Sequence, residues 1–327
     1  MAGPSVRVDY EGSPKGTIEP ELKNRHHPPR PSPATLSPKS ILWNNSRPIT
    51  RTGERMNSKA WSIITPLLLL SFALAGDEHK AGDAANWQVS FHDDFDSFNT
   101  DNWQDQILWV NNEDQCYVRD NQYNTREVSD GTLKIRVVNI GEERECDNVD
   151  KHGNKHPDTR YVAGRIASKN RQEFVKGKWT ARLRLHGDGV DGMFPAWWLL
   201  GAQNNEPPVQ EEDENICWPL TGSGEIDIFE HYGGNGPGHF VSRQIKSLGE
   251  CDKGDWESLM KVIDTDLNEY HEYSVEWQGP DLVFRLDDAE VYRIPGGGDD
   301  FPEPLFAILN YAKITDAPME GEWVMEV

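Results

Sequence analysis

The stretch Glu225-Ile226-Asp227-Ile228-Phe229-Glu230 places three acidic residues among apolar ones, in what its composition predicts to be a β-strand. Because successive side chains of a strand point to opposite faces, Glu225 and Asp227 share a face, whereas Glu230 would point the other way. One extra residue in the strand corrects this mismatch, and β-bulges of this kind are common beside active sites. We therefore expect a bulge around Ile228-Phe229 that brings all three carboxyl groups to one face.

The rest of the chain also has the pattern of strands. From Trp87 onward, apolar residues recur with a period of two, most clearly in Leu133–Val137 and Trp179–Leu185, which is typical of half-buried strands. Clusters of glycine and proline separate these runs, and long helical periodicity is nearly absent. The pattern favours an all-β sandwich or barrel of about 240 residues in a single domain.

Three shorter segments carry more specific predictions. The apolar runs 282–286 and 291–294 flank Asp287-Asp288 and predict a hairpin. Residues Trp256 to Asn268 are predicted to form a short helix, the only one in the domain. The final segment, Trp323 to Val327, alternates like a strand and stops without a turn signal, so we expect a domain whose C-terminal part is truncated.

The charge of the chain limits its partners. Its 327 residues carry a formal net charge of −22 at pH 7. A surface this acidic repels polyanions, so nucleic acids and anionic membranes are poor partners. We expect a monomer that acts on a polysaccharide, and repulsion argues mildly against a sulfated one.

The first 86 residues differ in composition from the rest. Residues 1–55 are rich in proline and basic residues, have no apolar periodicity and are predicted to be disordered. Residues 56–75 have the charged start, the short apolar middle at Leu67–Leu70 and the Ala73-Leu74-Ala75 end of a secretory signal. Because such signals lie at true N-termini, Met56 is a candidate start, and the first 55 residues would then be a start-site artefact.

The signal predicts where the protein works. Export would place it outside the cell or in a periplasm, with residues 76–86 as a linker and 87–327 as the catalytic domain. An uncleaved membrane anchor is the alternative, although the uncharged stretch is shorter than the roughly 20 residues that span a bilayer.

Four cysteines fit an oxidising compartment. Cys116, Cys146, Cys217 and Cys251 allow three disulfide connectivities, and none forms a C-x-x-C pair that would point to zinc. We favour Cys116 with Cys146 and Cys217 with Cys251, each closing a loop. Buried free thiols are the alternative.

Three acids on one face suit the hydrolysis of a glycoside. The reaction requires a carboxylate and a protonated carboxylic acid beside the anomeric carbon, about 5–5.5 Å apart in retaining enzymes and about 6.5–9.5 Å apart in inverting ones. Glu225 would be the nucleophile, and Glu230 the general acid and then the general base. Asp227 would raise the proton affinity of its neighbours and hydrogen-bond to the nucleophile. A solvated edge strand with outward charges is the alternative.

The segment Trp218-Pro219-Leu220-Thr221-Gly222-Ser223-Gly224-Glu225-Ile226-Asp227-Ile228-Phe229-Glu230 resembles the W-P…G-E-I-D-I-x-E signature of glycoside hydrolase family 16, in the bulged version of its laminarinase-like group. The resemblance covers residues 87–327. It implies a jelly-roll sandwich of two curved antiparallel sheets with a concave substrate cleft, and it assigns the nucleophile, the assisting acid and the acid/base to Glu225, Asp227 and Glu230. Other matching stretches are 91–96, 111–115, 164–166, 192–200 and 306–310.

The resemblance also suggests residues that bind substrate. Trp218 would stack on the sugar next to the cleaved bond. Trp197 and Trp198 are consecutive and so lie on opposite faces of a strand, which means that one can line the cleft while the other is core. Three further candidates could hydrogen-bond to sugar or serve as structural partners: Asn111, Glu113 and Arg165.

Together these patterns predict a secreted, retaining endo-β-glycanase that hydrolyses 1,3- or mixed 1,3-1,4-β-glucan. An agarase or carrageenase, a non-catalytic β-glucan-binding module and a wall transglycosylase are the alternatives. No organic cofactor and no catalytic metal are expected. Some relatives bind a structural calcium ion, and no residue of this chain can be assigned to such a site.

Overall fold

Strands make up nearly all of the regular structure, as the period-two patterns predict. The structure is a computed structural model, and it describes residues 5–11, 87–249, 251, 256–277 and 279–327. The predicted signal and linker lie outside these residues. In the described part of the chain, no helix is long and apolar enough to cross a membrane.

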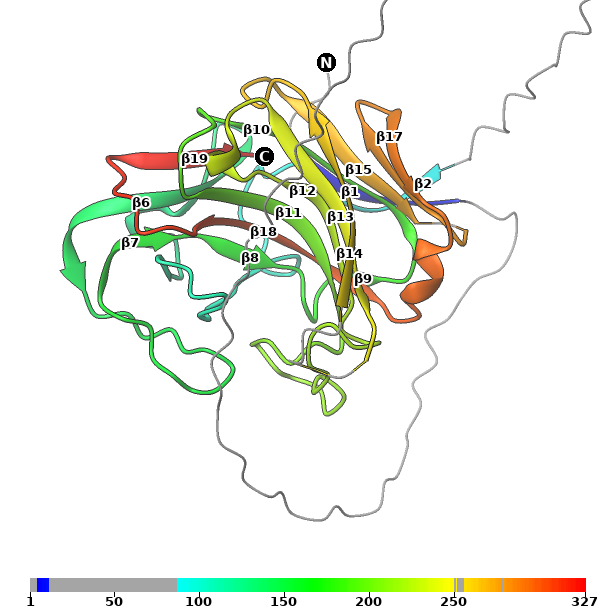
Figure 1. The fold of residues 1–327 in the computed structure, drawn as a ribbon, viewed down its shortest axis with the longest axis horizontal. Helices are drawn as coiled ribbons and strands as arrows, with labels where there is room; N and C mark the ends of the chain where they lie inside the picture. Colours follow the sequence, from blue (N-terminus) through cyan, green and yellow to red (C-terminus); the bar gives the residue numbers. More distant parts are fainter. Residues whose placement is uncertain (1–4, 12–86, 250, 252–255, 278) are drawn as a thin grey trace, which may run out of the picture. The chain divides into compact units, whose positions relative to one another are not determined.

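The described strands form two sheets, here called the front sheet and the back sheet. The front sheet contains the acidic stretch, and its strands run as a curved layer through the centre of Figure 1. In sheet order it consists of β14 (Trp256–Asp264), β13 (His239–Ser247), β12 (Glu225–Glu230), β11 (Met193–Gly201), β18 (Leu305–Lys313), β8 (Arg165–Ala167) and β3 (Gln104–Asp105), with β9 (Glu173–Phe174) paired to β18.

The back sheet is larger and almost wholly antiparallel. In order it consists of β17 (Ala289–Ile294), β16 (Leu282–Leu286), β15 (His271–Trp277), β10 (Gly177–Leu185), β19 (Glu322–Glu326), β6 (Thr132–Arg144), β7 (Thr159–Ala163) and β4 (Cys116–Tyr117). Three more strands pair with it: β1 (Val6–Glu11), β2 (Trp87–Asp93) and β5 (Arg126–Ser129). Short 3-10 turns are η1 (Gln122–Asn124), η2 (Gly233–Asn235) and η3 (Gly297–Asp300).

The two sheets enclose one main core. Trp197 and Phe229 from the front sheet pack in the same buried cluster as Trp179 and Val275 from the back sheet. The opposite face of the front sheet has a separate small apolar cluster around Leu200, against which Trp198 and Trp218 pack. This is the jelly-roll sandwich that the sequence predicts, and its front sheet has one face free for a site.

The predicted bulge lies in β12. Trp197 pairs with Phe229 and Trp198 pairs with Asp227, so Ile228 is the extra residue between them. Ile228 and Phe229 are both buried in the main core. Glu230 therefore returns to the face that carries Asp227, as the parity argument requires.

The predicted hairpin is also present. Strands β16 and β17 pair, and the turn residues Asp287 and Asp288 both have positive φ, at 49° and 66°. Two positive φ values match the twist of a tight hairpin, and aspartate tolerates them better than most residues do.

Both favoured disulfides are present. Cys116 bonds to Cys146 and Cys217 bonds to Cys251, across sequence separations of 30 and 34 residues. All four cysteines are paired, so the alternative of free thiols is wrong.

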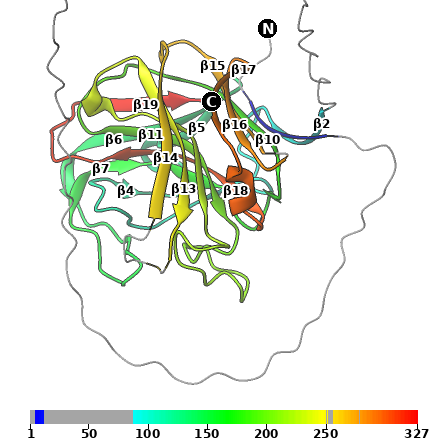
Figure 2. The same ribbon diagram turned by 45° about the vertical axis from the view of Figure 1, so that its right-hand side comes forward.

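One predicted helix is wrong. Residues Trp256 to Asp264 form strand β14, which pairs with β13 along its whole length and lies beside it in both views (Figure 1, Figure 2). An edge strand with mostly exposed side chains needs no strict alternation. Pairing with β13 supplies the backbone hydrogen bonds that a sequence pattern cannot reveal.

The prediction that residues 1–55 are disordered is wrong for Val6–Glu11. Val6–Glu11 form β1, which pairs with β2 on one side and β10 on the other. Val6 and Val8 are fully buried in the main core. Their period-two spacing was obscured by the polar composition of the surrounding segment.

The C-terminal segment forms the predicted strand. Strand β19, in red in Figure 1, lies between β10 and β6, and Val327 exchanges two backbone hydrogen bonds with Leu133. Truncation of the domain stays a prediction.

The placement of β1 can be tested in the full-length chain. Val8→Asp would bury an unpaired carboxylate and should lower the free energy of unfolding by at least about 3 kcal/mol. Val89, in the neighbouring β2, is 63% exposed, so Val89→Asp is the matched control and should change stability little. Equal unfolding midpoints for the two variants in chemical denaturation would show that β1 does not occupy this place.

Candidate active site

The three acids of β12 lie together on the face of the front sheet that points away from the main core. Asp227 and Glu230 are buried, and Glu225 is half-buried at the start of the strand. The bulge is held by a specific contact, because the Ser242 hydroxyl donates a hydrogen bond of 2.8 Å to the carbonyl of Ile228. The structure therefore brings Glu225, Asp227 and Glu230 to one face of the sheet, as the sequence predicts.

An arginine that sequence reasoning did not single out lies among these acids. Arg243 of β13 is the direct cross-strand partner of Asp227. Its guanidinium lies 3.3 Å from Asp227 Oδ2 and forms an ion pair with Glu230. Tyr232 donates a hydrogen bond of 3.4 Å to Glu230 Oε1 and accepts one from Arg243. The sequence does not show that β13 pairs with β12, so it could not identify Arg243 as the cross-strand partner of Asp227.

Burial shifts the proton equilibria of all three acids in the same direction. Burial, reinforced by the Glu230 charge, raises the pKa of Glu225 to about 7. Burial and the charges of Glu230 and Glu225 raise the pKa of Asp227 well above its ordinary value. Burial also raises the pKa of Glu230, against the opposing effect of Arg243. Like charges this close cannot all ionise, so the cluster retains protons near neutral pH.

This electrostatic arrangement predicts that Glu225→Gln stabilises the protein. Because the folded state raises the pKa of Glu225 from 4.5 to about 7, ionisation of Glu225 removes stability as pH rises through that window. A glutamine does not ionise, so the variant should be more stable than the wild type at pH 8, by about 1–3 kcal/mol. The gain should vanish at pH 4.5.

Urea denaturation at pH 4.5 and pH 8 measures this effect. Glu320→Gln, at an exposed position, is the control and should give the same small change at both pH values. A Glu225→Gln variant that is destabilised at pH 8, or that gains equally at both pH values, contradicts the electrostatic account.

Tryptophans line the face beside the acids. Trp218 is half-buried, lies next to Glu225 and packs edge-on against Trp256 of β14 at 5.6 Å between ring centroids. Trp198 is half-buried on the same face, and its indole N–H donates a hydrogen bond of 2.7 Å to Asn310 Oδ1. Trp197 is fully buried in the main core. Of the two consecutive tryptophans, Trp198 is therefore the one on the site face, and the assignment of Trp197 to substrate binding is wrong.

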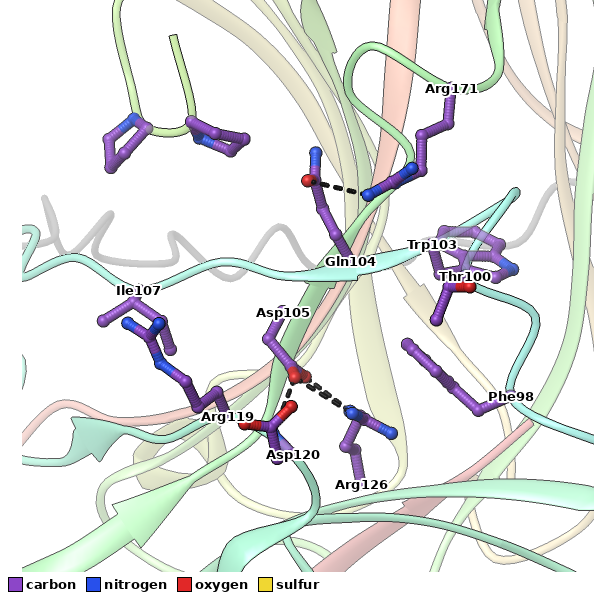
Figure 3. Close-up of a pocket in the computed structure, with 12 residues that line it drawn as sticks. Phe98, Thr100, Trp103, Gln104, Asp105, Ile107, Arg119, Asp120, Arg126 and Arg171 are labelled. Carbon is purple, nitrogen blue, oxygen red and sulfur yellow. Dashed lines mark hydrogen bonds and ion pairs between the residues drawn. The ribbon is translucent and has the colours of Figure 1, made fainter. Parts of the chain in front are cut away.

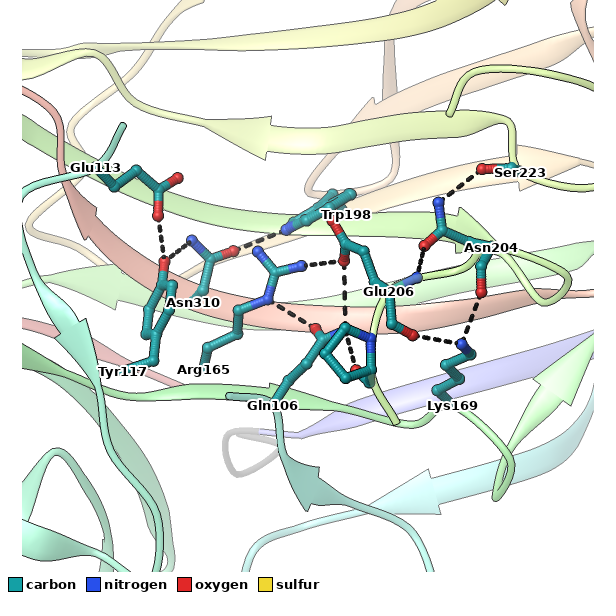
Figure 4. Close-up of polar contacts among 11 residues, drawn as sticks. Gln106, Glu113, Tyr117, Arg165, Lys169, Trp198, Asn204, Glu206, Ser223 and Asn310 are labelled. Atoms are coloured by element: carbon teal, nitrogen blue, oxygen red, sulfur yellow. Dashed lines mark hydrogen bonds and ion pairs between the residues drawn. The ribbon is translucent and has the colours of Figure 1, made fainter. Parts of the chain in front are cut away.

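Arg165 of β8 extends the site away from the acids. Its guanidinium lies 5.1 Å from the Trp198 ring centroid, donates 2.7 Å to Gln106 Oε1 and pairs with Glu206 at 2.8 Å. Figure 4 shows two hydrogen-bonded groups side by side, Arg165 with Gln106 and Glu206 in one and Asn310 with Trp198 in the other, and the Arg165 guanidinium over the Trp198 ring is the contact between them. Arg165 is almost fully buried, so little of its side chain is accessible to a ligand. Its main effect is to position Gln106, Glu206 and Trp198, which it contacts.

The two other candidates differ in their placement. Glu113 is buried and accepts hydrogen bonds from Gln115 at 2.8 Å and from the Tyr117 hydroxyl at 3.1 Å, and burial raises its pKa to about 7. Through Tyr117 it joins the network at Asn310 (Figure 4). Asn111 lies in an exposed turn with φ of 52°, and its side chain makes no hydrogen bond to this network.

Lys169 holds the loop that carries Glu206. Its ammonium group is fully buried, donates to the carbonyls of Asn204 and Glu206 at 2.7 Å each, and pairs with Glu214 at 3.1 Å. Its three donors therefore have three partners from one loop. This contact sets the position of the Glu206 side chain beside Arg165, and sequence reasoning missed both residues.

Removal of this lysine should loosen the loop. Lys169→Met would leave the buried Glu214 carboxylate without its counter-charge and two carbonyls without their donor, and it should lower the free energy of unfolding by about 3–5 kcal/mol. Lys155, whose ion pairs with Glu145 and Asp147 are exposed, provides the control, since Lys155→Met should change the free energy of unfolding little. Denaturant titration of both variants measures the difference, and similar losses would refute a special role for Lys169.

Metal binding by side-chain clusters is not indicated in the part of the chain that is described. Among these residues there is no group of three or more histidine, cysteine, aspartate or glutamate side chains arranged to hold a metal ion. The structural calcium ion stays an untested alternative.

A jelly-roll sandwich with coupled carboxyl groups on the free face of one sheet is the arrangement of a carbohydrate-cleaving enzyme. The chain belongs to the glycosyl hydrolases family 16, whose family model matches residues 109–310. It is thus a glycoside hydrolase, and the resemblance found in its motifs is confirmed.

Several characterised proteins are similar to this chain. A β-glucanase of Rhodothermus marinus is 24% identical over 234 residues, which make up 70% of this chain and 72% of that protein. Glucan endo-1,3-β-glucosidase A1 of Niallia circulans is 25% identical over 229 residues, and the chain spans only 28% of its length. A single-residue variant of LamA of Zobellia galactanivorans, crystallised in complex with laminaritriose and laminaritetraose, has a TM-score of 0.59 and 26% identity, with 72% of this chain and 94% of that chain covered.

Proposed function

We propose that this protein is a secreted endo-glycanase that hydrolyses 1,3- or mixed 1,3-1,4-β-glucan with retention of anomeric configuration. The observation that carries the proposal is the bulged strand β12, which brings Glu225, Asp227 and Glu230 to one face. The names of the similar proteins, which include a β-glucanase and a glucan endo-1,3-β-glucosidase, support the substrate class.

In the proposed reaction, two carboxyl groups act in sequence. The Glu225 carboxylate attacks the anomeric carbon while the Glu230 carboxylic acid protonates the departing glycosidic oxygen, so that the bond to the leaving sugar breaks as the glycosyl-enzyme ester forms. The Glu230 carboxylate then removes a proton from water, which attacks the same carbon and releases Glu225. Two inversions give net retention.

Asp227 and Arg243 would set the protonation of this pair. Protonated Asp227 donates a hydrogen bond to Glu225, which stabilises the nucleophile as a carboxylate. Arg243 contacts both Asp227 and Glu230, so it would stabilise the Glu230 carboxylate that forms when the acid has given up its proton. Arg243 keeps its positive charge in both steps, whereas the catalytic proton leaves Glu230 in the first step and a proton from water returns to Glu230 in the second.

Sugar binding would use the aromatic and polar groups beside the acids. The apolar faces of sugar rings stack on exposed aromatic surfaces, which Trp218 and Trp198 provide. Glu206, which is only partly covered, would accept hydrogen bonds from sugar hydroxyls while its ion pair with Arg165 holds it in place.

Two observations support secretion. The two disulfides fit an oxidising compartment, and residues 56–75 have the pattern of a secretory signal.

Variants of the two glutamates test the mechanism. Glu225→Gln should abolish turnover, because an amide cannot form the ester. Glu230→Ala should lower kcat on laminarin by about 10²–10⁴-fold, and azide should restore part of the rate on an aryl β-oligoglucoside, whose leaving group needs little protonation. Proton NMR of the first product should show retained configuration.

The substrate assay should compare laminarin, lichenan, agarose and carrageenan by release of reducing ends. We expect cleavage of the first two only, with Glu225→Gln as the inactive control. Wild-type rates in either glutamate variant would remove that residue from its role, and an inverted product would overturn the double displacement. Release of reducing ends from agarose or carrageenan alone would show that the substrate is a galactan and not a β-glucan.

A further inference from the structure

A second concave site lies at the β3 edge of the front sheet. It has a cavity volume of about 420 Å³, within the range of small-ligand pockets. Its walls, most of which Figure 3 labels, come from six parts of the chain: the segment around Thr100, strand β3, the turn that contains Arg119, Arg126 of β5, Arg171 after β8 and the loop at Pro207-Pro208. None of the residues to which we assign catalysis lines it.

The walls of this pocket combine flat apolar surfaces with hydrogen-bonding groups. Phe98, Ile107 and the ring faces of Pro207-Pro208 supply the apolar part. One wall is held in place, because Arg126 pairs with Asp105 at 3.0 Å and its guanidinium lies 3.7 Å from the Phe98 ring centroid. A pocket with a fixed wall needs little reorganisation to bind a ligand.

Two other arginines in the pocket have free donors. Arg171 is exposed and makes a single hydrogen bond of 3.3 Å, to Gln104 Oε1. Arg119 is exposed, and its guanidinium has no hydrogen bond or ion pair with any residue that the structure describes. Asp120, at the rim, supplies acceptor oxygens (Figure 3).

The charge balance of the pocket favours a neutral ligand. Three arginines face two aspartates, Asp105 and Asp120, and Arg126 and Asp105 neutralise each other as an ion pair, so the site carries only one net positive charge on a strongly acidic protein. An anion would gain little from such a site, whereas a polyhydroxylated ring can use arginine donors, aspartate acceptors and apolar walls together.

A row of side chains connects this pocket to the acidic strand. Passing from β12 towards β3, the side chains on this face are Trp198 on β11, Asn310 on β18, Arg165 on β8 and Gln106 just after β3 (Figure 4). Trp198 is half-buried and the other three are buried. Gln106 donates a hydrogen bond of 2.9 Å to the carbonyl of Pro207, which lines the pocket. Four strand spacings separate β12 from β3, roughly 19 Å.

We propose that this pocket binds a distal sugar unit of a neutral β-glucan chain, several units away from the bond that is cleaved. The inference rests on the proposed function and deepens it, since the chain would run across the strands from Glu225 to the pocket. Binding there anchors a long substrate and contributes nothing to a short one. The site therefore sets a preference for chain length.

The test compares two pocket variants on a series of laminari-oligosaccharides from the tetramer to the decamer. Arg119→Ala/Arg171→Ala removes the free donors, and Thr100→Trp fills the pocket from an exposed position at its rim. For the wild type we expect kcat/KM to rise in a step at the length that reaches the pocket. Both variants should lose the step, with a roughly fivefold to 50-fold lower kcat/KM on long chains and values within about twofold on the tetramer.

Arg160→Ala and Thr100→Ser are the controls. Arg160 is an exposed arginine on β7, outside the pocket, that pairs with Glu143 of β6, and serine preserves the open pocket. Both should keep the step, and thermal melting should show that all variants fold. A wild type without a step, a step unchanged in the pocket variants, or equal losses on short and long chains would each overturn the proposal.

A binding measurement separates this proposal from the proposed catalysis. In the Glu225→Gln background, migration in native gels that contain laminarin, lichenan, agarose or carrageenan reports binding without turnover. Retardation by laminarin or lichenan that Thr100→Trp weakens supports the pocket even if the wild type cleaves neither glucan. Retardation by carrageenan alone, or retardation that neither pocket variant changes, overturns it.

Discussion

The site depends on a single extra residue in β12. Without the bulge at Ile228, Glu230 would point into the main core and Phe229 would point out of it. The bulge interrupts strand pairing, and two features compensate: both Ile228 and Phe229 are buried, and Ser242 satisfies the carbonyl of Ile228 at 2.8 Å. Packing of Ile228 and Phe229 in the main core thus fixes the backbone that carries the acids. The positions of the carboxyl groups on the free face therefore depend on the packing of the core.

The acids themselves oppose folding at neutral pH. Three carboxyl groups share one face with Arg243, and burial raises the pKa of each. One guanidinium cannot neutralise three carboxylates, so protons stay in the cluster. A glycosidase needs this state, with one acid protonated and another ionised at the same pH. The sandwich core and two disulfides provide the stability that tolerates it.

The polar face of the front sheet is organised by residues that reach across strands. Lys169 fixes the loop of Glu206, Glu206 fixes Arg165, and Arg165 lies against Trp198. Each contact joins segments distant in sequence, and the row continues past Gln106 to the pocket at the β3 edge. Catalysis and distal binding would therefore share one rigid support instead of resting on separate loops.

The sequence by itself determined what local periodicity can encode. Alternation gave the strands, the parity of Glu225, Asp227 and Glu230 required the bulge, and Asp287-Asp288 marked a hairpin, because each depends on neighbours a few residues apart. Only the tertiary structure decided which of the paired tryptophans faces the site, that residues 256–264 pair as an edge strand and that Val6–Glu11 join the back sheet. It also brought Arg243, Glu206 and Lys169 to their partners. Such choices depend on which distant strand or loop lies alongside, and a single sequence does not record that contact.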